Sequence, residues 1–342
     1  MGVKLSDLID GKKLDLDELN GKIIAVDAFN ILYQFITTIR QPDGSPLTDS
    51  KGNNTSHLIG LFYRFTNLIK KNIKLIFVFD GASHELKKAE QERRSEIKTD
   101  AEQKYKEAEM IDDLESMKKY ASRTARLTKE MIAESKQLLE GMGIPWIQAI
   151  SDGEAQCAKI VKDGNAYAVM SQDADSMLFG APRVIKNLSI SQRKKKKGSL
   201  SSEKTMPEII TLNDVLLSLE ITQEELIILG ILVGTDFNPG GIKGIGPKKA
   251  LKLVKDFKDH NKLFEEVGWD DNFDYDWKEV FDIFMNPKYN EDYTIEWNNF
   301  DKDKIMKILV EEHDFSKTRI SEVCEEVLNS LNKEQKGLSD FF

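Results

Sequence analysis

The chain has 342 residues, of which 31% are charged and 40% are hydrophobic, and its formal net charge is −9. A chain of this length forms about two domains, or one large domain with insertions, and can bury a core without disulfides or structural metals. The negative net charge excludes a uniformly basic nucleic-acid-binding protein, although basic residues can still gather in local patches.

The cysteines and the hydropathy pattern indicate the cellular compartment. Cys157 and Cys324 cannot form a disulfide framework, and their separation does not fit a metal-binding knuckle. No apolar run reaches the ~18 residues that a membrane span needs. We therefore expect a soluble protein of the reducing cytoplasm.

Three short apolar runs, at 23–26, 75–79 and 167–170, are rich in β-branched or aromatic residues. Such runs are typical of buried parallel strands. Amphipathic helical patterns alternate with them, for example around Leu32 and around Leu138. The alternation predicts an α/β fold with a central, mostly parallel sheet flanked by helices.

Two segments differ from this pattern. Residues 85–120 are densely charged, almost without glycine or proline and only weakly amphipathic, so we expect an exposed helical insertion that projects from the sheet. The basic run at 193–199 fits either a solvent-exposed hairpin tip or a DNA contact, and both interpretations stay open.

Acidic residues gather where the predicted strands end. Asp27 directly follows the first strand and Asp80 the second, and two more residues, Asp173 and Asp175, follow the third. Because open parallel sheets bind ligands at the carboxyl ends of their strands, these four side chains should lie close together. Asp27 and Asp175 could also be ordinary helix N-caps.

Three further carboxylates occur at helix boundaries. Asp152 and Glu154 stand where a helix is expected to begin, and Asp236 follows an apolar helix at 226–233. Ser151 and Glu154 also have the spacing of a capping box, which explains that pair equally well by itself.

The seven carboxylates together favour a metal site. Like charges repel unless cations neutralise them, and ligand sets made only of oxygen suit Mg²⁺ or Mn²⁺. The sequence has no equivalent histidine cluster, which argues against zinc. The pattern predicts a two-metal site for phosphodiester hydrolysis, with ions ~3.5–4 Å apart.

A glycine-rich turn at 241–250 joins two predicted helices. Its glycines let the backbone approach a phosphate closely, Pro247 suits a first helical turn, and the second helix offers unpaired N–H groups. Lys248 and Lys249 add positive charge. The arrangement predicts a helix-hairpin-helix that holds duplex DNA by its backbone without reading its sequence.

Six motifs spread over nearly the whole chain carry a family resemblance. They are VDA at 26–28, VFDG at 78–81, GEAQ at 153–156, SQDAD at 171–175, GTDFNPGG at 234–241 and LVEEHDF at 309–315. With these motifs the sequence resembles the flap endonucleases, the structure-specific 5′ nuclease family, in their archaeal form. The resemblance implies a central parallel sheet, a helical arch through which the 5′ flap threads, and two Mg²⁺ ions.

The resemblance also assigns the carboxylates to the two ions. It places Asp80, Asp152 and Glu154 around one ion and Asp173, Asp175 and Asp236 around the other, with Asp27 acting through water. Mn²⁺ is expected to substitute for Mg²⁺.

Further positions match residues that contact DNA in this family. Lys87 and Arg94 fall at arch positions that contact the scissile phosphate, and their spacing puts them about two helical turns apart on one face. Tyr33 matches the aromatic residue on which the unpaired nucleotide beside the cut stacks; without the resemblance, a core tyrosine would be the preferred interpretation. The other expected DNA-binding residues are Arg40, Arg64, Gly234, Lys243, Gly244, Gly246, Lys248 and Lys249. A monovalent cation at the helix-hairpin-helix is a further expectation.

The sequence departs from the family pattern at three places. Asp152 stands where many relatives have glutamate, which shortens its reach by one methylene and leaves open a metal contact through water. Ala-Ser-His at 82–84 replaces the usual Lys-Pro-Pro at the entry to the arch, and Ala174 replaces a bulky residue. None of these changes removes a catalytic carboxylate, so we expect an active enzyme.

The end of the chain resembles the motif that binds the sliding clamp (PCNA). Gln335, Leu338, Phe341 and Phe342 match its glutamine, its aliphatic residue three positions on and its paired aromatics. Two phenylalanines in a flexible tail are a liability unless a hydrophobic pocket receives them. We expect residues 331–342 to form a flexible tail that binds the clamp.

The expected organisation has four parts before this tail. They are an N-terminal part of the nuclease domain at 1–84, an arch insertion at 85–135, an internal nuclease part at 136–258 with the helix-hairpin-helix at about 223–258, and a C-terminal helical region at 259–330.

Together these features predict a monomeric, Mg²⁺-dependent endonuclease at the nucleoid that removes 5′ flaps in DNA replication and repair, with 5′-3′ exonuclease activity as well. One alternative is a relative that mainly trims ends or cuts four-way junctions, which the whole-chain resemblance and the short tail disfavour. Another is a non-catalytic DNA scaffold recruited by the clamp. The seven carboxylates disfavour the scaffold, since an inert protein gains nothing from acidic charge beside DNA.

Overall fold

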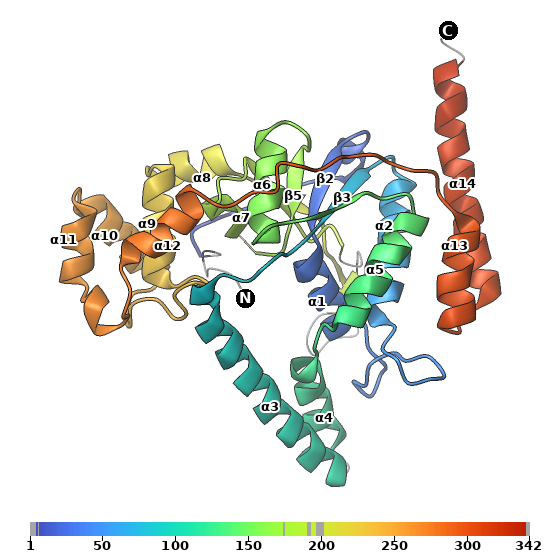
Figure 1. Ribbon diagram of the computed structural model, residues 1–342, viewed down its shortest axis with the longest axis horizontal. Coiled ribbons are helices and arrows are strands. Elements are labelled where there is room, and N and C mark those ends of the chain that lie inside the picture. The colour runs from blue at the N-terminus through green and yellow to red at the C-terminus, as the bar shows by residue number, and fades with distance from the viewer. Residues whose placement is uncertain are drawn as a thin grey trace.

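The structure is a computed structural model that describes residues 5, 7–111, 113–173, 175–189, 193–195 and 202–339. Among these residues, a seven-stranded sheet with the order β1-β9-β6-β5-β2-β3-β4 lies at the centre, and helices cover both of its faces (Figure 1). A two-stranded ribbon, β7-β8, stands apart from it. The strands are β1 (Lys12–Lys13), β2 (Ile23–Asp27), β3 (Lys74–Phe79), β4 (Trp146–Gln148), β5 (Ala168–Met170), β6 (Arg183–Lys186), β7 (Arg193–Lys195), β8 (Ser202–Lys204) and β9 (Glu208–Thr211).

The sheet is mostly parallel, as predicted. Strands β4, β3, β2, β5 and β6 run parallel, and β9 lies antiparallel between β6 and β1. Ile24, Ala25 and Val26 of β2 are fully buried, because helices cover both faces of the sheet. Asp27 lies opposite Val78 of β3, so the carboxyl ends of β2 and β3 meet at one edge.

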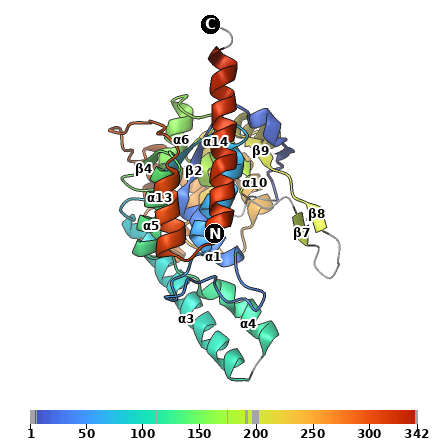
Figure 2. The same cartoon turned by 90° about the vertical axis from the view of Figure 1, so that its right-hand side faces the viewer.

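Helices from distant parts of the chain form the two covering layers. One layer shares a core with Ile24 and Phe77 and consists of α1 (Ala28–Thr38), α2 (Ser56–Ile69), α5 (Lys129–Gly141), α13 (Lys302–Met306) and α14 (Lys317–Ser339). The other shares a core with Ala25 and Val78 and contains α6 (Gly153–Lys162), α7 (Asp175–Leu178), α8 (Leu212–Leu219) and α9 (Gln223–Val233). Figure 2 looks onto the first layer, where α14 stands beside α13. None of the described helices is both long and apolar enough to cross a membrane.

The predicted insertion is a pair of helices that projects from the body (Figures 1 and 2). A short turn, Glu85–Lys87, leads into α3 (Lys88–Met110), and α4 (Leu114–Ala121) packs back against it. Ala101 and Ala108 are the buried apolar side chains of α3, so the two helices approach each other over small residues.

The insertion ends earlier than the sequence predicted. The expected boundary at 135 is wrong, because residues 129–135 already belong to α5. Leu138 and Leu139 of this helix are fully buried in the core of the body, which anchors the helix there.

The helix-hairpin-helix consists of α9 and α10 (Pro247–Asp256), within the predicted range of 223–258. Helix α9 is apolar on all sides and buried, while α10 is amphipathic and begins with Pro247 in its first turn. Two further helices, α11 (His260–Glu266) and α12 (Trp277–Met285), follow it at the same end of the molecule (Figure 1).

The C-terminal region is not helical throughout. Residues 286–301 form neither helix nor strand and cross from α12 to α13. Trp297 Nε1 donates to the Leu75 carbonyl at 3.0 Å, and the Asn298 N–H donates to Gly143 at 3.1 Å. These bonds hold the segment against the body. The bond from Asn298 also provides a hydrogen-bond partner that a helix would otherwise supply to a polar backbone group of the segment.

The end of the chain also differs from the expected flexible tail. Helix α14 continues to Ser339, so the backbone at Gln335 and Leu338 is helical. Residues 331–336 include no glycine or proline that would end the helix earlier. Phe341 and Phe342 lie outside the described residues.

Candidate active site

Two of the predicted carboxylates lie at the shared edge of β2 and β3. Asp27 ends β2 and is 4% exposed, and Asp80 directly follows β3. The Asp27 carboxylate accepts a hydrogen bond from the Asn30 N–H at 3.1 Å and caps helix α1. The N-cap interpretation is therefore correct for Asp27. The capping carboxylate lies at the same sheet edge as Asp80.

The start of α6 brings Asp152 and Glu154 to the same edge. The Gly153 N–H donates to Asp80 Oδ1 at 2.7 Å, and a Cβ atom on Gly153 would lie only 2.6 Å from that oxygen. Only glycine allows this approach. The capping-box interpretation of Ser151 and Glu154 is wrong, because the N-cap residue is Asp152 and its side chain makes no capping bond.

The end of β5 contributes Asp173 and Asp175, the latter as the first residue of α7. Asn30 Nδ2 donates to Asp173 Oδ2 at 2.9 Å, and Asn30 Oδ1 accepts from the Gln172 N–H at 3.2 Å. Asn30 thus links the first turn of α1 to the loop after β5. Asn30 is not among the residues that the sequence predicts, because its bond to Asp173 forms only when α1 packs against the loop after β5.

The seventh carboxylate, Asp236, lies in the turn after α9. This turn depends on Gly234, whose φ of +108° disfavours any residue with a side chain. A Cβ atom there would also lie 2.5 Å from the Gly241 backbone nitrogen. The close approach of the two glycines holds Asp236 facing the arch, where it accepts a bond from Arg94 Nη2 at 2.7 Å.

Burial and mutual repulsion raise the pKa values of three of these carboxyl groups. Burial raises the pKa of Asp27 well above its usual value, and the charge of Asp80 raises it further. Burial and then the charge of Asp175 do the same to the pKa of Glu154. Burial raises the pKa of Asp80 to about 6, although Lys87 opposes the shift. Asp173 adds to the shifts of both Asp27 and Glu154, so the carboxylates form one interacting group.

The first turns of the arch carry two cations into this group. Lys87 Nζ bonds to Asp152 Oδ1 and lies 4.7 Å from the centre of the Phe237 ring. Burial lowers the pKa of Lys87, but the surrounding carboxylates, with Asp152 first, raise it above its usual value. Arg94, two turns along α3, reaches Asp236. The fold therefore brings Lys87 and Arg94 to the carboxylate site, where they bond Asp152 and Asp236.

The donor set fits divalent cations of the Mg²⁺ type. Within the part of the chain that the structure describes, no three acidic, histidine or cysteine side chains form a ready-made metal-binding group. Lys87 and Arg94 instead bond two of the carboxylates. The seven carboxylates still form a hard, all-oxygen site with an excess of negative charge, which suits Mg²⁺ or Mn²⁺.

Tyr33 lies on α1 beside the arch helix α3. It is 39% exposed on α1, and Lys98 Nζ lies 5.1 Å from the centre of its ring. The interpretation as a core tyrosine is therefore wrong, and the exposed ring offers a face on which a nucleotide base can stack.

Arg40 and Arg64 are half-buried beside this region. Arg40 Nη1 donates to the Gly44 carbonyl at 3.0 Å, while its Nε is buried and has no hydrogen-bond partner among the described residues. Burial lowers the pKa of both arginines. A buried N–H of an arginine that lacks a hydrogen-bond partner indicates a place where an anionic group can bind.

The turn of the helix-hairpin-helix exposes its basic residues. Lys243, Lys248 and Lys249 are exposed, and Gly244 has a φ of +80°. Gly246 is the N-cap of α10, whose first N–H groups therefore face outward without a side-chain cap. This is the arrangement that binds a phosphate at a helix N-terminus.

Comparisons with known proteins agree with this geometry. Residues 1–101 match the XPG N-terminal domain and residues 143–236 match the XPG I-region. The Flap endonuclease 1 of Staphylothermus marinus is 47% identical over 350 residues, which cover 100% of this chain and 100% of that protein. The chain belongs to the flap endonuclease family. It is accordingly a structure-specific flap endonuclease, a hydrolase that cleaves DNA.

Other relatives and solved structures support the same family fold. The Flap endonuclease 1 of Hyperthermus butylicus is 46% identical, with 98% of this chain and 97% of that protein covered. The flap endonuclease-1 structure from Methanococcus jannaschii has a TM-score of 0.76 at 40% identity and covers 97% of this chain and 100% of its own. The catalytic core of Rad2 in complex with DNA substrate shares the fold, with a TM-score of 0.71 at 23% identity over 96% of this chain and 100% of its own.

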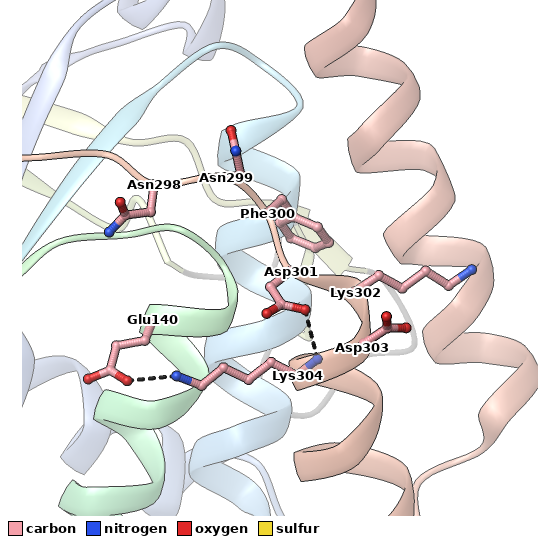
Figure 3. A pocket seen from close by; sticks show the side chains of 8 residues that line it. All are labelled: Glu140, Asn298, Asn299, Phe300, Asp301, Lys302, Asp303 and Lys304. Carbon is pink, nitrogen blue, oxygen red and sulfur yellow. Dashed lines mark hydrogen bonds and ion pairs between the residues drawn. The ribbon is translucent and has the colours of Figure 1, made fainter.

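A large surface hollow of this flap endonuclease lies away from the carboxylates. The hollow of about 820 Å³ in Figure 3 lies between the end of α5 and the start of α13. Lys304 crosses it to Glu140 at 2.7 Å, and Asp301 accepts from the Lys304 N–H at 2.9 Å. Its polar lining already forms internal bonds and contains none of the predicted site residues, so the hollow is not the active site.

Proposed function

We propose that this flap endonuclease hydrolyses a phosphodiester bond at the base of a 5′ flap with two Mg²⁺ ions during DNA replication and repair. The observation that supports this most is the meeting of seven carboxylates with Lys87 and Arg94 where the arch joins the sheet. A flap substrate with a labelled 5′ end tests the proposal directly. Release of the flap with Mg²⁺ and not in its absence supports it, whereas cleavage without a divalent ion, or removal of single terminal nucleotides only, contradicts it.

The carboxylates would hold the ions in two sets. We assign Asp80, Asp152 and Glu154 to one ion and Asp173, Asp175 and Asp236 to the other, with Asp27 acting through water. Bound there, the ions would polarise the phosphate and supply a nucleophilic water at neutral pH. GEN1, which shares the fold at 18% identity and a TM-score of 0.63, has been solved with product DNA and a Mg²⁺ ion, and this favours Mg²⁺. Mn²⁺ should substitute for it.

The chain's own cations and aromatic ring supply the rest of the mechanism. Lys87 and Arg94 would donate to the scissile phosphate and stabilise the negative charge that grows on it as the bond breaks. Their bonds to Asp152 and Asp236 place both side chains beside the carboxylates, which supports this role. Tyr33 would stack on the unpaired nucleotide beside the cut, and the exposed ring supports this role.

The duplex would be held by Arg40, Arg64 and the helix-hairpin-helix. The exposed lysines and open backbone of the turn support a contact with phosphates, which positions DNA without reading its sequence. A monovalent cation at this turn would complete the phosphate contact. The enzyme would act as a monomer in the cytoplasm, where the nucleoid lies.

The double variant Lys248→Ala/Lys249→Ala should weaken flap binding and lower its salt dependence. Each phosphate contact releases counterions, so the slope of log binding constant against log salt should fall by about two. Binding titrations at several salt concentrations measure it. Lys258→Ala/Lys262→Ala, an equally charged change at two exposed lysines farther along the chain, is the control. Identical slopes for both double variants would contradict the phosphate contact.

We also propose that Gln335, Leu338, Phe341 and Phe342 recruit the sliding clamp (PCNA), on the basis of their sequence pattern. Phe341→Ala/Phe342→Ala should leave cleavage of a free flap unchanged and abolish stimulation by the clamp. The benefit of the clamp is a raised effective concentration at the nick rather than new chemistry. The measurement is a paired assay of both proteins with and without clamp. If the clamp stimulates both equally, the contact lies elsewhere.

A further inference from the structure

A buried acid at the base of the arch has no part in the roles proposed above. Glu90, in the first turn of α3, is 4% exposed, whereas its neighbours Gln91 and Glu92 are exposed. A buried carboxylate is costly unless cations and hydrogen bonds compensate it. The partners of Glu90 therefore indicate why this position is acidic.

Both oxygens of Glu90 accept bonds from arginines one turn farther along the helix. Oε2 accepts from Arg93 Nε at 2.7 Å, and Oε1 accepts from Arg93 Nη2 at 2.7 Å and from Arg94 Nε at 2.6 Å. Burial by itself raises the pKa of Glu90, but these bonds bring it below its usual value, so the group stays charged. The bidentate hydrogen bond from Arg93 fixes the orientation of the Glu90 carboxylate.

Arg94 is consequently bonded at two atoms, by two different acids. Its Nε donates to Glu90 within the arch, and its Nη2 donates to Asp236 Oδ1 at 2.7 Å in the turn after α9. Because the guanidinium is planar and rigid, the bond at Nε sets the direction in which Nη2 points. That direction leads into the carboxylate site.

We propose that Glu90 is a positioning residue that aims Arg94 at the scissile phosphate. The bond from Arg94 Nε to Glu90 stays in place when DNA binds. The bond from Nη2 to the Asp236 carboxylate is replaced by a bond from Nη2 to a phosphate oxygen. Carboxylate and phosphate oxygens accept from guanidinium in the same way, so the exchange at Nη2 needs no movement of Nε. The inference rests on the proposed contact between Arg94 and the phosphate.

A double-mutant cycle with Glu90→Gln and Arg94→Ala tests the inference. Single-turnover cleavage is measured at saturating enzyme, and flap affinity is measured without Mg²⁺. Glu90→Gln should slow cleavage by about tenfold or more in the native background, because a small misplacement of a catalytic group is costly. In the Arg94→Ala background the same change should slow cleavage by less than about twofold. Flap affinity should stay within about twofold. Glu92→Gln, which makes the same charge change at an exposed position of the same turn, should leave the rate unchanged.

The outcomes separate the inference from the proposed function. The positioning role of Glu90 would be overturned if Glu90→Gln lowers the cleavage rate equally in both backgrounds or does not lower it at all. It would also be overturned if the loss of rate is matched by weaker flap binding. Full activity of Arg94→Ala alone would overturn the role of Arg94 itself. If Glu90→Gln lowers the melting temperature, Glu90→Asp, which keeps the charge but is one methylene shorter, takes its place in the same cycle.

A second readout needs neither DNA nor metal. In protein labelled with ¹⁵N-arginine, the Nε–H signal of Arg94, identified by its loss in Arg94→Ala, should exchange slowly with solvent because Glu90 accepts its bond. Exchange should become faster in Glu90→Gln and stay slow in Glu92→Gln. Equal exchange in all three proteins would overturn the inference.

Discussion

Replacing Asp80 or Asp175 by asparagine should abolish cleavage of a 5′ flap, with a loss of more than about 10³-fold. Metal ions contribute several kcal/mol to stabilising a phosphoryl transition state, which corresponds to about three powers of ten in rate or more. Binding of the flap should change little, because we propose that the helix-hairpin-helix and the arch, and not the metal ligands, hold the DNA. Single-turnover assays and flap-binding titrations on the same proteins measure the two effects separately.

Asp163→Asn is the matched control for this experiment. Asp163 follows α6 and pairs with Lys159 at 2.7 Å, so the substitution makes the same charge change outside the carboxylate site. It should cleave at the normal rate. Near-normal turnover by Asp80→Asn or Asp175→Asn at moderate Mg²⁺ would contradict the assignment of these residues to metal ions.

Lys87→Ala and Arg94→Ala should each slow single-turnover cleavage by about 10²–10³-fold, with little loss of flap affinity. A positive charge beside the reacting phosphate matters most when negative charge grows there in the transition state, so the loss falls on the rate and not on binding. The rate at saturating enzyme and the dissociation constant without Mg²⁺ are the two quantities to compare.

Lys88→Ala is the control for Lys87→Ala, because Lys88 is the next residue, is exposed and pairs with Glu85 instead of a site carboxylate. It should keep the normal rate. If Lys87→Ala and Arg94→Ala lose affinity in proportion to their rates, the two residues serve only as electrostatic anchors for DNA.

Much of the fold could be predicted from short-range patterns. The apolar runs around Val26, Val78 and Val169 have the composition of buried strands, and each forms a parallel strand of the sheet. Pro247 and the glycines before it likewise marked the start of α10. These features were accessible because strand burial and helix initiation depend on residues that are close together in the sequence.

Other boundaries were wrong for a physical reason. The arch is predicted to end at 135, whereas α5 begins at Lys129, where the Thr128 side chain accepts a bond from the Met131 N–H at 3.3 Å and caps the helix. Leu138 and Leu139 place this helix in the core of the body. The segment at 286–301 was expected to be helical, but its bonds to Leu75 and Gly143 hold it extended along the body. In this second case contacts with distant residues override the local preference.

The order of residues along the chain shows which carboxylates follow the strands, and parallel strands bring them to one edge, since side chains after successive strands must meet there. How these carboxylates are held depends on tertiary packing. Asn30 reaches Asp173 across 143 residues of sequence, and Arg94, aligned by Glu90, reaches Asp236 across 142. Bonds of this kind arise when separate elements pack together, so they leave no periodicity or spacing in the chain from which they could be read.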